Sequence, residues 1–187
     1  ENVYVGVRRG LNSILGLQTD GPHQTAVNVG VRLPTGYDRD SMPTVGSGQV
    51  DLDVMVYYGA SLWPAPAYAQ VGAGLRVRSG LYALSTGDSD GLDYGNEWLL
   101  HAEVGASLGK WALIQGLFFG TVSNQPPDLA FDPENPLPTR QRYVKPGLGL
   151  TVYPARWFGL SAQVFSTPWG ANTVASTDWF FGIESRF

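Results

Sequence analysis

The chain has 187 residues, of which 15% are charged, 43% are hydrophobic and 12% are aromatic, with 24 glycines, six tryptophans and no cysteine. This charge content is well below the roughly 25% of an ordinary soluble domain, and so many glycine and aromatic residues argue against a helical bundle. No run approaches the ~20 consecutive apolar residues of a membrane-spanning helix, which excludes a helical membrane protein. The remaining class with little charge and many aromatic residues is the transmembrane β-barrel, whose strands are apolar on one face only.

Apolar residues recur at every second position along most of the chain. Residues 27–33 place valine and leucine on one face and Asn28, Gly30 and Arg32 on the other, which is the period of a β-strand. The alternation of residues 27–33 recurs over residues 51–58, 69–78, 98–108, 144–152, 158–164 and 179–187. Residues 111–122 have no clear phase. The pattern predicts an all-β, antiparallel fold.

The N-terminal segment decides how many strands are expected. If residues 2–19 form one strand, nine are visible, although single-chain bacterial barrels have an even number. Either Val3 to Arg9 and Ile14 to Thr19 form two short strands around Gly10, giving ten, or upstream strands are missing from this chain. We therefore expect a single transmembrane β-barrel domain over residues 1–187, with nine or ten strands in view and about 10–12 in the full barrel.

The expected connections alternate in length. Tight turns fall near 20–22, 64–66, 108–110 and 154–156, and long polar loops cover 35–49, 80–95, 125–140 and 168–177. Bacterial outer-membrane barrels have short periplasmic turns and longer extracellular loops, so the pattern predicts an integral outer-membrane protein with the long loops outside the cell. A soluble sandwich or lipocalin-like barrel also alternates. Here, however, the polar face carries many glycines beside charges of both signs, and the apolar face is Val, Leu and Ala, as suits lipid contact.

The tryptophans all lie near expected strand ends. Trp prefers the membrane–water interface, where its ring is half buried and its N–H stays hydrated. One set of three flanks tight turns and the other lies near long loops, so we expect two interfacial girdles. The six residues are Trp63, Trp111 and Trp157 at the turns, and Trp98, Trp169 and Trp179 at the loops.

The C-terminus ends on an aromatic residue within an alternating strand. Phe181, Ile183 and Phe187 occupy every second or fourth position up to the last residue. This arrangement resembles the C-terminal signal of outer-membrane barrels, which the barrel-assembly machinery recognises. We expect these residues to serve as that assembly signal.

Polar side chains gather on the faces expected to point inward. Asp51 and Asp53 are expected diagonally across from Arg76 and Arg78, as an ion-pair ladder. The charges either neutralise one another and lock the barrel, or line a pore and select solutes by charge. The candidate pore-lining residues are Arg32, Asp51, Asp53, Arg76, Arg78, His101, Glu103, Gln115, Lys145, Gln163, Glu184 and Arg186.

No combination of residues favours an enzyme. The histidines are His23 and His101, and Ser107 is expected too far from His101 for a Ser–His pair. The acidic segment 88–93 has carboxylates for Ca²⁺ but lacks the full calcium loop, so a solvated turn and no metal site are expected. We expect no catalytic residue and no cofactor. The net charge of −4 and the dispersed arginines also disfavour a nucleic-acid partner.

Two short segments carry a family resemblance. Leu33-Pro34-Thr35-Gly36-Tyr37-Asp38 and Val45-Gly46-Ser47-Gly48-Gln49-Val50-Asp51 resemble the outer-membrane family of transporters of the meta-pathway of phenol degradation. In that family a strand ends in Leu-Pro-Thr-Gly and a Gly-Ser/Thr-Gly-Gln segment opens the next. The resemblance implies further upstream strands, about twelve in all, and a channel for small solutes, aromatic ones included.

These expectations combine into one functional hypothesis and one alternative. The first is an outer-membrane channel for passive passage of small aromatic or hydrophobic solutes. The alternative is a structural or partner-binding outer-membrane barrel with a blocked lumen. The expected partners are outer-membrane lipids, the barrel-assembly machinery, a small-molecule solute and, in the alternative, another envelope protein.

Overall fold

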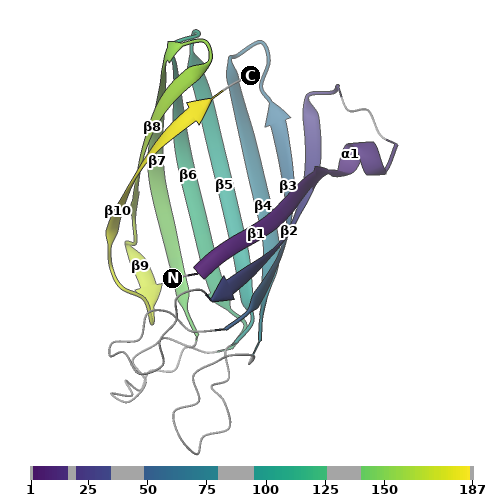
Figure 1. Ribbon diagram of the computed structural model, residues 1–187, viewed down its shortest axis with the longest axis vertical. Coiled ribbons are helices and arrows are strands. Elements are labelled where there is room, and N and C mark those ends of the chain that lie inside the picture. Colours follow the sequence, from purple (N-terminus) through teal and green to yellow (C-terminus); the bar gives the residue numbers. More distant parts are fainter. Residues whose placement is uncertain (1, 17–19, 35–48, 80–94, 126–139, 186–187) are drawn as a thin grey trace, which may run out of the picture.

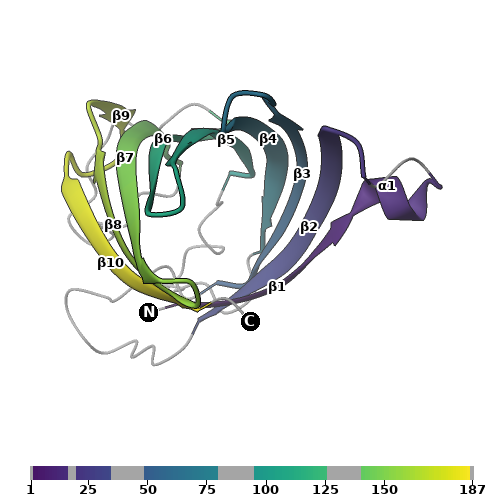
Figure 2. The ribbon, with the colours of Figure 1, turned by 90° about the horizontal axis from the view of Figure 1, so that it is seen from above.

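A computed structural model describes residues 2–16, 20–34, 49–79, 95–125 and 140–185. These residues form one antiparallel β-sheet that curls strongly around a central space (Figures 1 and 2). The all-β, antiparallel prediction is confirmed. Among the described residues, no helix has the length and apolar character needed to cross a membrane.

Nine strands follow one another along the sheet, in the order β1-β2-β3-β4-β5-β6-β7-β8-β10. A short strand, β9, pairs with β7 beside β8. The strands are β1 (Asn2–Gly10), β2 (His23–Pro34), β3 (Asp51–Ser61), β4 (Ala67–Arg78), β5 (Glu97–Leu108), β6 (Ala112–Ser123), β7 (Arg142–Ala155), β8 (Phe158–Ser166), β9 (Trp169–Ala171) and β10 (Thr177–Ser185).

The sheet has an apolar outer face and an inner face rich in polar and aromatic side chains. Because side chains alternate along a strand, the outward residues of β3 are Leu52, Val54 and Val56, all exposed, while Asp51 and Asp53 on the other face are buried. The same alternation repeats along β4 and β5. This is the reverse of a water-soluble domain, in which charged groups are mostly exposed.

The two ends of the sheet differ in their connections. One end, here called the short-turn end, holds the tight links after β3, β5 and β7, as expected at 64–66, 108–110 and 154–156. The turn after β5 uses Gly109 at φ 59°, a left-handed conformation that glycine adopts without a steric penalty. The opposite end, here called the long-connection end, is where β2, β4 and β6 finish. Most of the segments that follow them lie outside the described residues.

The N-terminal segment differs from the two-strand alternative. β1 covers the first expected strand, but Leu11–Ile14 forms a short helix, α1, so the second expected strand does not begin at Ile14, and residues 17–19 of it lie outside the described residues. Asn12 holds this connection against β2, because its side-chain oxygen accepts hydrogen bonds from the backbone N–H and the hydroxyl of Thr25, at 3.0 and 2.6 Å. The expected tight turn at residues 20–22 is therefore only the last part of a longer connection.

The predicted loop at 168–177 is also wrong in part. Trp169–Ala171 is strand β9, which continues the line of β8 along β7 after an interruption. Proline has no N–H to donate to a ladder, and Pro146 on β7 and Pro168 on the other strand both lie at the interruption. The remaining link to β10 is short.

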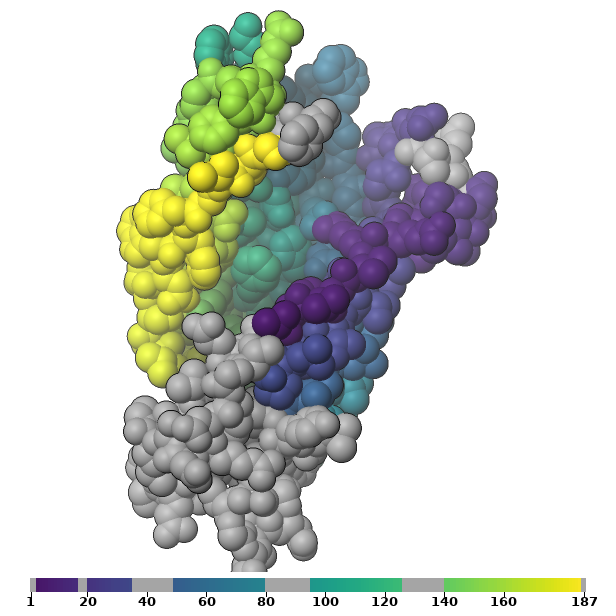
Figure 3. Space-filling view, viewed as in Figure 1, coloured from purple at the N-terminus to yellow at the C-terminus, as the bar shows by residue number. Residues whose placement is uncertain are grey.

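The sheet has two free edges, β1 and β10. Each neighbouring pair along the nine-strand order is antiparallel, so the first and ninth strands run in the same direction. No backbone pairing joins these edges within the described part of the chain. Figure 3 shows atoms of the far wall through the opening between the yellow β10 and the purple β1. The structure is thus a curled half-barrel.

Candidate functional site

The inner face carries the polar residues that the sequence predicts there, within the described ranges. Their pore-lining role stays a prediction. The residues with side chains on this face are Arg32, Asp51, Asp53, Arg76, Arg78, His101, Glu103, Gln115, Lys145, Gln163 and Glu184. Arg186 lies outside the described residues.

A charged cluster joins β2, β3, β4 and β5 near the long-connection end. Asp53 is its centre, with Oδ1 2.8 Å from Nε of Arg76 and Oδ2 3.1 Å from Nε of Arg32. Arg76 also donates from Nη1 to Glu97 at 2.7 Å, and Arg78 donates to the same carboxylate at 3.1 Å. A chain of ion pairs therefore crosses four neighbouring strands.

The ladder geometry differs from the diagonal arrangement expected from the sequence. Asp53 pairs in register with Arg76, and Asp51 with Arg78, so the opposite charges lie directly across from each other. Hairpin register depends on the turn between the strands, which alternation alone does not specify. Direct opposition brings the side chains close enough for Arg76 to bind both oxygens of Asp53.

The acids of this cluster are almost fully buried. Asp53 is 4% exposed and Glu97 2% exposed. Burying a carboxylate is costly unless hydrogen bonds and opposite charges compensate it, and here three arginines face Asp51, Asp53 and Glu97. Gln49 adds a hydrogen bond of 2.7 Å to Asp51. Removal of one member would leave its partners buried and charged.

A row of aromatic rings follows the inner face around from β3 to β10. The ring centroids are 5.6 Å apart for Tyr57 and His101, and 5.0 Å apart for His101 and Phe119. The row continues from Phe119 to Phe165 at 5.4 Å and from Phe165 to Phe180 at 5.7 Å. These are ordinary distances for interacting rings. We call these five residues the ring row.

Inner-face glycines make room for rings on neighbouring strands. Gly72 pairs in register with Tyr57, and a Cβ at Gly72 would lie 2.6 Å from Cδ1 of that ring. Phe165 covers Gly147 in the same way, and Tyr68 covers Gly105. Each ring lies sideways along the wall because its neighbour lacks a side chain. This arrangement keeps large residues out of the central space.

A second polar cluster lies toward the short-turn end of β4, β5 and β6. The Glu103 carboxylate accepts hydrogen bonds from the hydroxyl of Tyr68 and, at 2.8 Å, from Nε2 of Gln115. His101 Nε2 lies 3.7 Å from the other Glu103 oxygen. On the opposite wall, Thr151 and Tyr153 contact Glu184 at 3.3 Å each. Polar groups therefore line both walls near this end.

Arg8 reaches across the inner face from β1. Its Nη2 donates to Oε1 of Gln70 on β4 at 2.9 Å, and its guanidinium carbon lies 4.3 Å from the ring centroid of Tyr57. Arg8 thereby connects strands that are not neighbours in the sheet.

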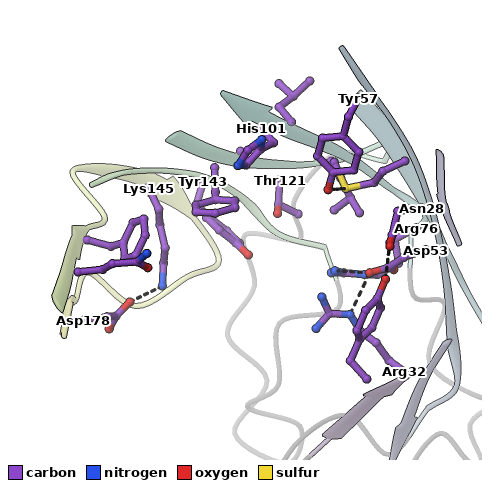
Figure 4. Close-up of a pocket in the computed structure, with 18 of the residues that line it drawn as sticks. Asn28, Arg32, Asp53, Tyr57, Arg76, His101, Thr121, Tyr143, Lys145 and Asp178 are labelled. Carbon is purple, nitrogen blue, oxygen red and sulfur yellow. Dashed lines mark hydrogen bonds and ion pairs between the residues drawn. The ribbon is translucent and has the colours of Figure 1, made fainter. Parts of the chain in front are cut away.

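A cavity of about 610 Å³ lies inside the curled sheet, between residues of β1–β5 on one side and of β6–β10 on the other. Figure 4 shows Arg32, Asp53 and Arg76 on one side of it and Lys145 with Asp178 on the other. Lys145 Nζ lies 2.6 Å from Oδ2 of Asp178, and both side chains are partly exposed. All five members of the ring row also line the cavity. A solute inside would meet charged groups and rings together.

The tryptophans lie on the outside of the sheet, at its two ends. Three occupy short turns and three begin or nearly begin strands at the long-connection end, as their sequence positions predict. All are 51% to 81% exposed. The residues are Trp63, Trp111 and Trp157 at the first end, and Trp98, Trp169 and Trp179 at the second. Their interfacial role stays a prediction.

The expected assembly signal is described in part. Phe181 and Ile183 lie exposed on the outer face of β10, in phase with Trp179. Phe187 lies outside the described residues, as do segment 88–93 and most of the two motif segments that carry the family resemblance. Within the described ranges, no group of three or more His, Asp or Glu residues is placed to hold a metal ion.

Sequence reasoning named His101 but missed the other four members of the ring row and Arg8. Phe165 and Phe180 look like ordinary apolar residues when one face of a strand is assumed to be polar, whereas Tyr57 shares the face of Asp53 and was recoverable. Phe119 was recoverable, because it follows Gln115 by four positions and therefore shares its face. Arg8 shares the inner face of β1 with Tyr4.

Comparison of this chain with protein-family models, curated proteins and solved structures gives no match. The functional argument therefore rests on the geometry described above.

Proposed function

We propose that this protein is an outer-membrane β-barrel that acts as a passive channel for small molecules. The observation that carries the proposal is the reversed distribution of side chains around a curled sheet. Outward residues such as Val7 and Phe181 are 71% and 79% exposed, while Asp53 and Glu97 are buried inside. Water would penalise so large an apolar surface, whereas a lipid bilayer would bind it.

The dimensions of the strands support this proposal. β5 has 12 residues, and from Trp98 to Leu108 a strand tilted near 40° would span roughly 25 Å. This matches the height of the apolar band of a transmembrane barrel. The tryptophans at both ends would then lie at the two membrane surfaces.

The central cavity supports a channel over a solid barrel. Glycines opposite the rings leave about 610 Å³ open between the walls, and the cavity is lined by polar groups that can replace water around a solute. The sequence resemblance to a transporter family is compatible with the same role.

Planar-bilayer recordings of the purified full chain test the proposal. Stepwise conductance is expected from protein that has been shown to be folded by its β-sheet circular dichroism. Complete absence of conductance from such protein would contradict the channel.

Arginine substitutions test membrane insertion separately. Val104 lies exposed on the outer face of β5, and a charge there would cost about 2–4 kcal/mol at the bilayer midplane. Val104→Arg should therefore impair assembly in vesicles. The matched control is Gln163→Arg, which places the same charge in the cavity and should assemble normally. Equal assembly of both variants would contradict a lipid-facing outer surface.

One observation favours the alternative of a barrel with a blocked interior. The Arg8–Gln70 hydrogen bond crosses the inner face between β1 and β4. If this bond obstructs passage, Gln70→Ala should produce conductance where the unmodified chain shows none. A conducting unmodified chain would exclude this alternative.

A further inference from the structure

The cavity has more basic than acidic side chains in its lining. Arg8, Arg32, Arg76 and Lys145 line it, against Asp53 and Asp178. Asp53 is shared by two of the arginines, and Asp178 is bound by Lys145. Glu103 and Glu184 lie toward the short-turn end and are not part of this lining. Because Arg76 also pairs with the buried Glu97, the excess positive charge of this lining lies at Arg8.

Arg8 is the base in this lining that has no acidic partner within the described part of the chain. One of its N–H groups binds the neutral amide of Gln70, and its flat face covers Tyr57. A guanidinium carries five N–H donors in a rigid fork that matches the two oxygens of a carboxylate. Arg8 thus retains donors for an anionic ligand.

The ring row begins beside this guanidinium. Arg8 lies over Tyr57, which is followed by His101 and Phe119 along the ring row. All five rings line the cavity, and Tyr57 and Phe165 lie sideways over Gly72 and Gly147, so the row offers apolar surface to the cavity. A ligand bound by Arg8 would therefore place its non-polar part against the rings.

We propose that the cavity is a binding site for small organic carboxylates with a flat apolar body, with Arg8 holding the carboxylate and the ring row holding the body. The cavity volume lies within the range of ordinary small-molecule sites. The proposal rests on the proposed channel function and specifies the solute class.

Binding to the purified full chain in lipid nanodiscs, measured by isothermal titration calorimetry, tests this site. The probes are benzoate, its neutral relative benzyl alcohol, and acetate, which has the charge without the ring. Benzoate is expected to bind at least tenfold more tightly than either of the others, because only benzoate uses both parts of the site. Benzyl alcohol or acetate binding as tightly as benzoate would overturn the proposal, as would no benzoate binding at all.

Arg8→Gln removes the charge and should weaken benzoate binding about tenfold or more without changing benzyl alcohol binding. The matched control is Arg9→Gln, which removes the same charge from the neighbouring position on the outer face of β1 and should leave benzoate binding unchanged. Equal weakening by the two variants would reduce the effect to general electrostatics and overturn the site.

Should Arg8→Gln fail to fold, Arg8→Lys decides the matter, because it keeps the charge and loses the fork. The affinity of the Arg8→Lys variant for benzoate is expected to fall several-fold, and an unchanged affinity would overturn the assignment.

Conductance in KCl separates this proposal from the channel function. Benzoate binding that depends on Arg8 in a non-conducting protein would support the site and contradict the channel. Conductance without benzoate binding would do the reverse.

Discussion

The two walls of the inner face are built differently. The charged wall, β2 to β5, is cross-linked by ion pairs between directly opposed and diagonally placed residues, with Asp53 and Glu97 buried among arginines. The ring wall, β6 to β10, is lined mainly by Phe119, Phe165 and Phe180, and its one described ion pair is partly exposed. One wall depends on directional electrostatic contacts and the other on ring packing.

Because of this difference, contacts that stabilise the fold and contacts available to a solute lie mainly on different walls. A buried charge tolerates few alternatives, because each lost partner leaves an uncompensated group in a poorly hydrated space. Ring contacts are less directional, so a ring can be exchanged at a lower cost. We therefore expect substitutions of the ion-paired residues to affect folding, and those that remove or move a ring to affect passage.

The largest effect is expected from Arg76→Met. This substitution leaves Asp53 and Glu97 buried without their shared partner and should lower the free energy of unfolding by about 3–5 kcal/mol. Urea unfolding from lipid vesicles, followed by tryptophan fluorescence, measures the loss. Lys145→Met on the ring wall is the control and should lose much less, because its pair with Asp178 is partly exposed. Comparable losses would remove the distinction between the walls.

A smaller effect is expected where a ring needs its glycine. Gly72→Ala places a Cβ 2.6 Å from the Tyr57 ring, so the ring must move toward the cavity. Overpacking of this kind costs about 1–3 kcal/mol, and the displaced ring should lower single-channel conductance. Gly59→Ala is the matched control, since the nearest atom would lie at an ordinary 3.7 Å. A Gly72→Ala channel as wide and stable as the control would contradict the fit of ring over glycine.

Phe119→Ala should widen the cavity beside the ring wall with a modest loss of stability. Phe119 is 40% exposed and lines the cavity, and its ring contacts the rings of His101 and Phe165. Loss of two ring contacts should cost about 1–2 kcal/mol, while conductance rises. Unchanged conductance in planar bilayers would show that the constriction lies elsewhere.

The smallest effect concerns salt. The Lys145–Asp178 pair is accessible to solvent, so 1 M NaCl should screen most of its contribution. The difference in urea midpoint between the unmodified chain and Lys145→Gln should therefore nearly vanish in salt. The corresponding difference for Arg76→Met should persist, because its partners are buried.

Alternation predicted most of the sheet because one face of nearly every strand is apolar. It failed where a local contact replaced the period, as at α1, where Asn12 binds Thr25, and at β9, where Pro146 and Pro168 interrupt a ladder. Neither interaction leaves a period of two in the sequence.

The candidate site was predicted through its charges and missed through its rings. Charged residues on alternate positions stand out against valine and leucine, whereas inward phenylalanines do not. The direct opposition of Asp53 and Arg76 required the hairpin register, and the fit of Tyr57 over Gly72 required the same register together with a side-chain direction. Both are properties of strand pairs.

The shared direction of β1 and β10 has a mechanical consequence. Direct union of these edges would create one parallel pair in an otherwise antiparallel wall, with slanted hydrogen bonds that are slightly weaker per residue. The closed barrel would then have one strand pair, β1 and β10, that separates most easily. Backbone amides of both strands should exchange with deuterium before those of β4 and β5, each of which has a hydrogen-bonded neighbour on either side.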